Sequence, residues 1–194
     1  MIRVVTFVLP KCHICLLMKL LLTIFSSLFI AFFLTQTVAQ QSQVISGPFL
    51  VREGVTFDQN TDEPITGVVQ TYYEHGQLAT IENYKDGRRD GISEIFHYEN
   101  GNWQRRENYK EGMRDGLQEK FYENGQLQIK ENFIDGQKDG LREEFHSNGQ
   151  LRSRESYKDG ERTGFLEQYN GLGQLLSKQC FQKDRKAESS LCIP

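Results

Sequence analysis

Apolar and polar residues alternate in short runs through most of the chain, and the same runs return at a nearly constant interval. The segment "DGLQEKFYENGQLQIKENFIDGQK" at 115–138 is followed at once by "DGLREEFHSNGQLRSRESYKDGER" at 139–162. Each contains two short runs in which polar and apolar residues alternate, as in β-strands, and neither sustains a 3.6-residue apolar period. The pattern therefore predicts repeated pairs of β-strands.

Five units carry this repeat, and equivalent positions in successive units form columns of one residue type. The first glycine column is Gly67, Gly91, Gly116, Gly140 and Gly164. Two aromatic columns are filled in every unit: Tyr72, Phe96, Phe121, Phe145 and Tyr169, and then Tyr84, Tyr109, Phe133, Tyr157 and Phe181. Periods of about 20–50 residues indicate a solenoid or array. The residues thus predict an all-β array of tandem hairpins.

Two kinds of turn join the strands. Asn124-Gly125 and its equivalents are a strong hairpin signal, because both residues tolerate positive φ. Segments such as "KDGRRDG" are expected to form a second, looser turn. A two-residue Asn-Gly turn would pair Glu119 with Lys130, whereas a three-residue turn would place Glu119 opposite Glu131 and both aromatic columns on one face. We favour the three-residue turn, since burying one aromatic side chain stabilises by roughly 1.5–3 kcal/mol.

The first 39 residues differ from the rest. They contain no acidic residue, and Lys19 precedes an apolar run of 15 residues from Leu20 to Leu34. This length is typical of a signal peptide and short for a membrane span. Small residues at the −3 and −1 positions predict cleavage after Ala39, and hence a secreted or periplasmic protein. An uncleaved membrane anchor is the alternative, and the start codon stays open between Met1 and Met18.

The net charge of the chain limits the classes of partner that it is expected to bind. Three of the 23 Lys and Arg residues lie in the leader, so 20 remain against 26 Asp and Glu residues. This acidic balance argues against nucleic acid and against an anionic membrane surface as the main partner. We predict a signal peptide at 1–39, an N-terminal capping strand at 40–65, five repeats at 66–186 and a C-terminal tail at 187–194.

Two of the four cysteines lie in the part expected after cleavage. In an exported chain Cys180 and Cys192 could form one disulfide, and two free thiols are the alternative. Closing so short a loop would stabilise by roughly 3 kcal/mol. Cys12 and Cys15 lie in the leader, where their spacing is interpreted as incidental.

The repeated motif, "YYENGQLxxxENYKDGxxDG", resembles the MORN repeat in its bacterial variant form. The segment "FDQNTDEPITGVVQTYYEHGQLATIENYKDG" is similar to the opening of the YwqK-type antitoxin family. The resemblance covers Phe57 to Lys186. It implies tandem β-hairpins joined into one elongated, twisted antiparallel sheet. It also implies a role as a scaffold, a membrane-associated linker or a protein-binding module.

One column departs from that family. Where the family usually has Gly before the second aromatic residue, this chain has Glu82, Glu107, Glu131, Glu155 and Gln179. Ionised side chains are almost never fully buried without a partner. We therefore expect these glutamates to rim the sheet in water, and the alternative is that they line a groove.

Residue patterns for catalysis are absent from the sequence. It has no nucleophile elbow and no phosphate-binding loop, and the columns that hold His97 and His146 accept other residues. The acidic stretch at 58–63 lacks the Gly and the closing Glu of an EF-hand, so we expect a polar turn there. We predict no enzymatic activity, no cofactor and no bound metal; an enzyme of unknown type is the least favoured function.

A partner-binding patch is the remaining hypothesis. One column varies between Tyr73, Tyr122, His146 and Asn170, and is expected to be exposed. Trp103 replaces leucine in its own column and accompanies an extra residue, which is expected to bulge that hairpin; a larger core residue is the alternative. We hypothesise that Tyr73, Tyr122 and Trp103 bind a partner.

The function predicted from the sequence follows from these points. The chain is expected to be a non-enzymatic exported protein that acts as a protein-binding or scaffold module at the cell envelope. Its partner would be a protein or another envelope component. The alternative is an antitoxin-like component that neutralises a toxin by direct binding.

Overall fold

The computed structural model describes residues 44–45 and 47–192, and these are almost entirely β-strand. The predicted signal peptide, its cleavage point at Ala39, the two start codons and the pair Cys12 and Cys15 lie outside the described residues. Within the described part of the chain, no helix is long and apolar enough to cross a membrane.

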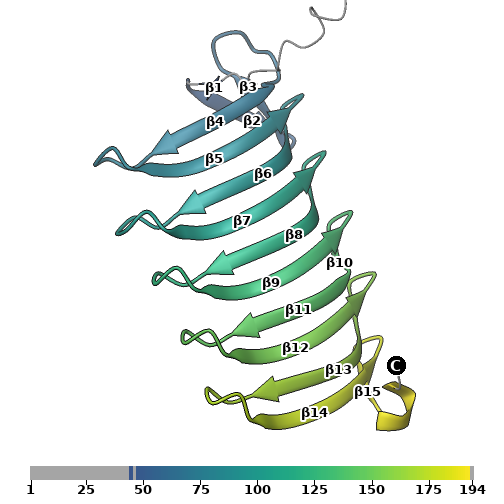
Figure 1. Cartoon of the computed structure of the whole chain (residues 1–194). Coiled ribbons are helices and arrows are strands. Elements are labelled where there is room, and N and C mark those ends of the chain that lie inside the picture. The colour runs from purple at the N-terminus through teal and green to yellow at the C-terminus, as the bar shows by residue number, and fades with distance from the viewer. Residues whose placement is uncertain (1–43, 46, 193–194) are drawn as a thin grey trace, which may run out of the picture. The chain divides into compact units, whose positions relative to one another are not determined.

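A sheet of 13 strands contains all five repeats, and its hairpins follow one another in chain order (Figure 1). The hairpins are β4 (Gly67–Tyr72) with β5 (Leu78–Lys85), β6 (Arg88–Phe96) with β7 (Trp103–Lys110), β8 (Met113–Phe121) with β9 (Leu127–Ile134), β11 (Gly140–Phe145) with β12 (Leu151–Lys158), and β13 (Glu161–Tyr169) with β14 (Leu175–Gln182). The predicted all-β array of tandem hairpins is confirmed.

Short strands cover both ends of the array. At the first end β1 (Val44–Ile45) pairs in parallel with β4, and β2 (Phe49–Arg52) and β3 (Val55–Asp58) form a separate two-stranded sheet. One capping strand was predicted here; the chain instead reverses at Glu53 and Gly54, which both have positive φ. At the last end β15 (Arg185–Ala187) pairs with β14.

The Asp-Gly turns between hairpins are the tight ones. Asp86 and Gly87 have φ of 50° and 74°, and the flanking residues Lys85 and Arg88 pair directly. Two residues with positive φ between paired strands are the requirement for a type I′ turn. Equivalent positive-φ pairs are Glu111-Gly112, Asp135-Gly136, Asp159-Gly160 and Lys183-Asp184. The prediction of a looser turn at these positions is therefore wrong.

The Asn-Gly turns are wider. The N–H of Tyr122 donates to the carbonyl of Gln126 at 2.8 Å, and Gly125, with φ of 80°, donates to the carbonyl of Tyr122. Three residues thus form the loop, with glycine in the left-handed position that this loop type needs. In the second unit the extra residue lengthens the loop, since His97 N–H bonds Asn102 instead. The predicted bulge does lie beside Trp103, where the register shifts between Ile95 and Phe96, but every hairpin has this shift, and the extra residue lengthens the loop instead.

The strand register differs from the one we favoured. Glu119 lies opposite Lys130, and the register shifts by one residue between Lys120 and Phe121. This bulge lets a three-residue loop lead into the charge-matched register of the two-residue alternative. Because side chains alternate along a strand, Phe121 and Phe133 lie on opposite faces of the sheet. The prediction of both aromatic columns on one face is wrong.

A second irregularity connects successive hairpins. The register between β7 and β8 shifts between Glu107 and Tyr109, and Gly116 opposite this point has φ of 94°. Asp115, just before it, accepts a hydrogen bond at 3.2 Å from the N–H of Asp135 in the next turn. The two Asp-Gly pairs of the third and fourth repeats thus differ in role: one forms the turn, and the other interrupts the regular strand and holds the following turn.

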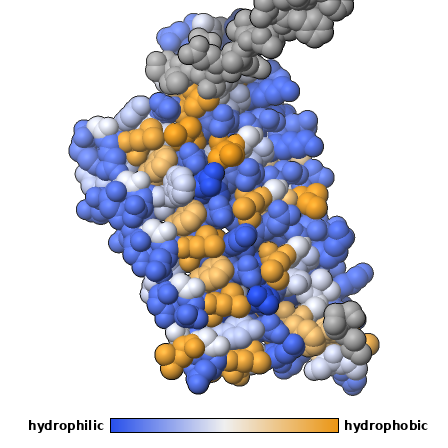
Figure 2. All heavy atoms as spheres, viewed as in Figure 1, coloured by the Kyte–Doolittle hydropathy of each residue, from blue (hydrophilic) through white to orange (hydrophobic). Residues whose placement is uncertain are grey.

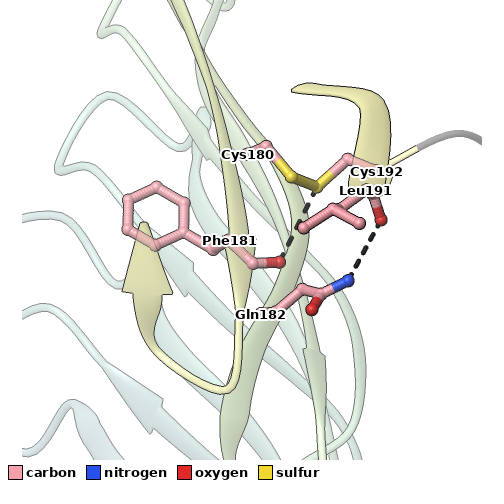
Figure 3. The surroundings of a disulfide bond; sticks show 5 residues. All are labelled: Cys180, Phe181, Gln182, Leu191 and Cys192. Carbon is pink, nitrogen blue, oxygen red and sulfur yellow. Dashed lines mark hydrogen bonds between the residues drawn. A yellow bond between two sulfur atoms is a disulfide. The ribbon is translucent and has the colours of Figure 1, made fainter. Parts of the chain in front are cut away.

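A disulfide holds the C-terminal end (Figure 3). Cys180 on β14 bonds Cys192 in a short 3₁₀ turn, η1 (Ser189–Cys192), and both residues are buried. Gln182 Nε2 donates to the carbonyl of Leu191 at 3.2 Å. Cys192 Sγ also lies 3.7 Å from the Phe181 carbonyl oxygen, a contact rather than a hydrogen bond, because a disulfide sulfur carries no proton.

Candidate functional site: the two faces of the sheet

The glutamate column does not rim the sheet. Glu107 is 6% exposed and Glu155 is 5% exposed. They lie in one row across the strands with Glu82 and Glu131, and this row defines what we call the glutamate face. The expectation of a solvated rim is wrong, because cations from the neighbouring hairpin compensate the buried charge.

Each compensating cation also covers an aromatic ring. Arg114 Nη2 lies 3.1 Å from Glu107 Oε1, and its guanidinium lies 5.5 Å from the ring centre of Phe133. Arg89 links Glu82 to Tyr109, Lys138 links Glu131 to Tyr157, and Arg162 links Glu155 to Phe181. One cation therefore joins a carboxylate of one hairpin to an aromatic ring of the next.

The first tyrosine of this face shows the electrostatic effect. The Tyr84 hydroxyl donates to Glu82 Oε2 at 3.2 Å. Burial, and after it the nearby Glu82 carboxylate, raises the pKa of Tyr84 above its ordinary value, because both disfavour a phenolate. The glutamate face is thus a packed polar layer in which each of the four glutamates has a cationic partner.

The opposite face, which we call the striped face, carries three rows that cross the strands. An apolar row contains Tyr72, Leu78, Phe96, Trp103, Phe121, Leu127, Phe145, Leu151, Tyr169 and Leu175. A charged row contains Glu94, Arg106, Glu119, Lys130, Glu143, Arg154, Glu167 and Lys178, which alternate in sign. A third row includes Ile92, Leu117, Leu141 and Phe165, which alternate with polar residues in the middle of the sheet.

Side chains of the apolar rows remain open to solvent. Trp103 is 42% exposed, Leu117 is 36% exposed and Leu175 is 53% exposed. Figure 2 shows apolar side chains in two rows that run down the sheet across the strands, with hydrophilic side chains between them. Within the charged row Arg106 Nε lies 3.0 Å from Glu94 Oε1. The striped face therefore combines exposed apolar surface with internally paired charge.

The structure separates the residues that the sequence grouped as a patch. Trp103 lies in the apolar row, 5.9 Å from the Phe121 ring, with the Arg106 guanidinium 4.8 Å from its own ring centre. Tyr73 and Tyr122 are half-buried instead, and each donates its hydroxyl to a carbonyl of the next hairpin, at 2.6 and 2.8 Å. These two tyrosines of the variable column thus form structural contacts between hairpins.

Sequence reasoning missed an aromatic cluster at the first two hairpin tips. Tyr98, the residue after His97 in the lengthened loop, is 52% exposed. Its ring lies 5.0 Å from Tyr73 and 4.5 Å from His75, edge to face. The repeat period placed Tyr98 outside every column, so only its presence beside the insertion could have indicated it.

The acidic stretch after β3 forms a polar turn. Asp58 Oδ1 accepts hydrogen bonds from the N–H groups of Asn60 and Thr61, at 2.7 and 3.3 Å, and Asp62 pairs with Arg52. Such side-chain contacts to the backbone are typical of an Asx turn. In the described part of the chain, no cluster of three or more His, Cys, Asp or Glu residues could hold a metal ion.

Comparison with protein families supports the interpretation of the hairpins. Residues 65–86, 114–135 and 138–159 match the MORN repeat variant. These MORN segments correspond to the first, third and fourth hairpins. The second and fifth hairpins lie outside the matches, although their strands pair in the same register; the second differs in its lengthened loop. No curated protein matches the chain. The resemblance to the YwqK-type antitoxin family therefore stays a prediction.

Proposed function

We propose that the chain is a non-enzymatic, exported repeat protein that binds a protein partner along its striped face. The observation that carries this proposal is the exposed apolar row that includes Trp103 and Leu175, beside a row of paired charges. Sheets normally bury an apolar face against a second layer, and a large exposed apolar patch marks a site of interaction. MORN repeats elsewhere serve as protein-binding modules, which agrees with this function.

The dimensions suit a protein surface better than a small ligand. Ten strands about 4.8 Å apart span about 45 Å, and three rows with their side chains span roughly 15–20 Å. The resulting area of about 800 Å² is what one partner contributes to a standard interface. The charged row alternates in sign, so it would set the register and the choice of partner more than the affinity. We expect a partner with an apolar stripe and charges of matching alternation.

Two features support export. The leader has the composition of a signal peptide, and the disulfide between Cys180 and Cys192 is of a kind that persists in oxidising compartments. N-terminal sequencing of the accumulated protein is expected to begin at Gln40. An N-terminus at Met1 or Met18 in the membrane fraction would assign the anchored alternative, and an intact chain in the cytoplasm would contradict export.

Site-specific photocrosslinking in the native envelope tests the binding face. A photoreactive residue in place of Leu117 or Leu141 should crosslink one partner, whereas the same residue in place of the exposed Gln168, on the glutamate face, should not. Leu117→Arg should abolish the product formed from position 141, because it puts an unpaired charge among the apolar side chains of the third row. Equal crosslinking from position 168, or a product that survives Leu117→Arg, would contradict docking on the striped face.

An antitoxin-like role is the alternative, and it rests on the sequence resemblance alone. It predicts that the crosslinked partner is itself toxic when it is produced without this chain. A partner that is not toxic would contradict the antitoxin function and would agree with the scaffold function.

A further inference from the structure

The third hairpin departs from the others on the glutamate face. Arg105 on β7 and Lys120 on β8 lie directly opposite each other. The other positions of that row are Thr71, Thr80, Ile95, Ile129, Glu144, Ser153, Gln168 and Ser177. Like charges directly opposite in adjacent strands destabilise a sheet. No other position of this row carries a cation, so the repeat pattern does not explain the pair.

Neighbouring carboxylates do not neutralise this pair. The nearest ion-pair contact of Arg105 joins its Nη1 to Glu107 Oε1 at 3.8 Å, and that carboxylate is already held by Arg114 at 3.1 Å. Lys120 forms no ion pair among the described residues. The two adjacent cations thus have between them one carboxylate contact, at 3.8 Å, and that carboxylate is already paired with Arg114.

A pocket of about 160 Å³ lies beside the two cations. Its lining includes Arg105, Lys120, Gln118 and Ile129, together with Arg114 and the carboxylates of Glu107, Glu119 and Glu131. Gln118 is 4% exposed; its Nε2 donates to the carbonyl of Asn108 at 2.8 Å, but its Oε1 has no hydrogen-bond partner among the described residues. An orphaned buried acceptor is costly, which favours a ligand or water with a donor at this point. The volume equals about five waters, or one small ring.

In the next hairpin, side chains of the protein itself close the same place. There Arg142 stands where the third hairpin has Gln118, and Glu144 stands where it has Lys120. Arg142 contacts Glu131, Glu144 and Glu155, at 3.4, 3.5 and 2.9 Å, so the network is complete. The third hairpin keeps the surrounding carboxylates but replaces the bridging cation with a neutral amide.

We propose that this pocket binds one sugar acid through its carboxylate and a hydroxyl group. The carboxylate would accept hydrogen bonds from Arg105 and Lys120, which offsets their mutual repulsion. A ring hydroxyl would donate to Gln118 Oε1, and the carbon face of the ring would pack on Ile129. The site lies on the glutamate face, so it does not depend on protein binding along the striped face.

Calorimetric titration of the purified protein with sodium glucuronate tests the site. Glucuronate should bind with one ligand per chain, and glucose, which lacks the carboxylate, should bind at least about tenfold more weakly, since charge-assisted hydrogen bonds are the stronger ones. The sugar acid could be a free monosaccharide or one residue of a polysaccharide, and an oligosaccharide that contains glucuronate distinguishes these two sources. If the oligosaccharide binds more tightly than free glucuronate, the natural ligand is a residue of a polymer.

Residues of neighbouring hairpins supply the matched variants. Lys120→Glu and Arg105→Ile place the side chains of the next hairpin in the site, and each should weaken glucuronate binding at least about tenfold. Lys110→Glu makes the same charge change in the β7 turn, away from the pocket, and should bind as the parent protein does. Circular dichroism checks that all three variants are folded.

Three results would overturn the proposal. They are no heat of binding with glucuronate, equal binding by Lys120→Glu and Lys110→Glu, and equal binding of glucose and glucuronate. Inorganic phosphate that competes as well as glucuronate would also overturn it, because it would reduce the site to a pair of cations without a role for Gln118.

Discussion

The hydroxyl of Tyr122 donates to the carbonyl of Phe145 in the following hairpin, at 2.8 Å. The same contact joins Tyr73 to Phe96, and His146 Nε2 lies 3.1 Å from the carbonyl of Tyr169. Two tyrosines and one histidine of this column thus form a contact across the junction between hairpins, whereas His97 Nε2, in the same column, has no hydrogen-bond partner among the described residues. Stability of the array depends on such junction contacts, because each hairpin touches only its neighbours.

Tyr122→Phe should therefore lower the free energy of unfolding by about 1 kcal/mol, the usual net value of a half-buried hydrogen bond. Tyr98→Phe is the matched control, since its exposed hydroxyl forms no hydrogen bond among the described residues. Urea titration measures both. If the two variants lose the same stability, the junction contact has no energetic role.

Glu155→Ala should be more damaging than an ordinary surface change. The carboxylate lies 2.9 Å from both Arg142 Nη1 and Arg162 Nε, and Glu155 is 5% exposed. Its removal leaves Arg162 without its carboxylate partner and takes from Arg142 the nearest of its three carboxylates, at a cost of about 2 kcal/mol or more. Glu161→Ala, an exposed position on β13, should cost less than about 0.5 kcal/mol. Similar denaturant midpoints for the two variants would show that the glutamate row is not structural.

A comparison of the melting temperatures of Gly87→Ala and Gly76→Ala should separate the effect of backbone strain from the effect of close packing. Both glycines have left-handed φ, 74° and 88°, so both substitutions carry a strain of about 1–2 kcal/mol. A Cβ at Gly87 would lie 2.7 Å from the carbonyl oxygen of Thr56, whereas one at Gly76 would have no atom within 4 Å. Gly87→Ala should thus melt at the lower temperature. Equal melting temperatures would mean that β3 does not pack on the first Asp-Gly turn.

The stability of the last hairpin should depend on pH through Glu167. A hydrogen bond from Lys178, and the attraction of that ammonium group, lowers the pKa of the Glu167 carboxyl below its ordinary value. A carboxyl with a lowered pKa in the folded state stabilises the fold above its unfolded pKa of about 4.3, and this contribution is lost as the pH falls through the folded value.

Glu167→Gln should therefore lower the free energy of unfolding at neutral pH, by about 0.5 kcal/mol or less because the pair is partly solvated. At pH 2 the substitution should have little effect. The comparison requires urea titrations at several pH values. A stability difference that stays constant from pH 7 to pH 2 would refute the linkage.

Cys192→Ser should loosen the C-terminal end rather than the whole sheet. Loss of the 12-residue cross-link to Cys180 is expected to cost about 3 kcal/mol at this end of the array. Hydrogen exchange should rise in β14 and β15, and stay unchanged in the first hairpin. The same increase after addition of a reductant to the parent protein, and no further increase in the reduced variant, would assign the effect to the disulfide.

The sequence alone was sufficient for the number of repeat hairpins, their order and the place of the turns within and between them. These features are local: Gly125 and Gly87 adopt left-handed φ because of their own covalent structure, and alternation between Leu127 and Phe133 marks a strand without reference to any partner. The aromatic columns could also be recognised from the sequence, because an aromatic residue recurs at the same position in every unit.

Only the tertiary structure decided which residues of the repeat meet. The bulge between Lys120 and Phe121 sets the register, and the charge pairs of neighbouring strands favour it over the one with both aromatic columns on one face. Burial of Glu107 depends on Arg114 in the following hairpin, and the role of Tyr122 depends on a carbonyl 23 residues away. Such contacts join groups on different hairpins, and a column of identical letters does not say which face it lies on or which cation will compensate it.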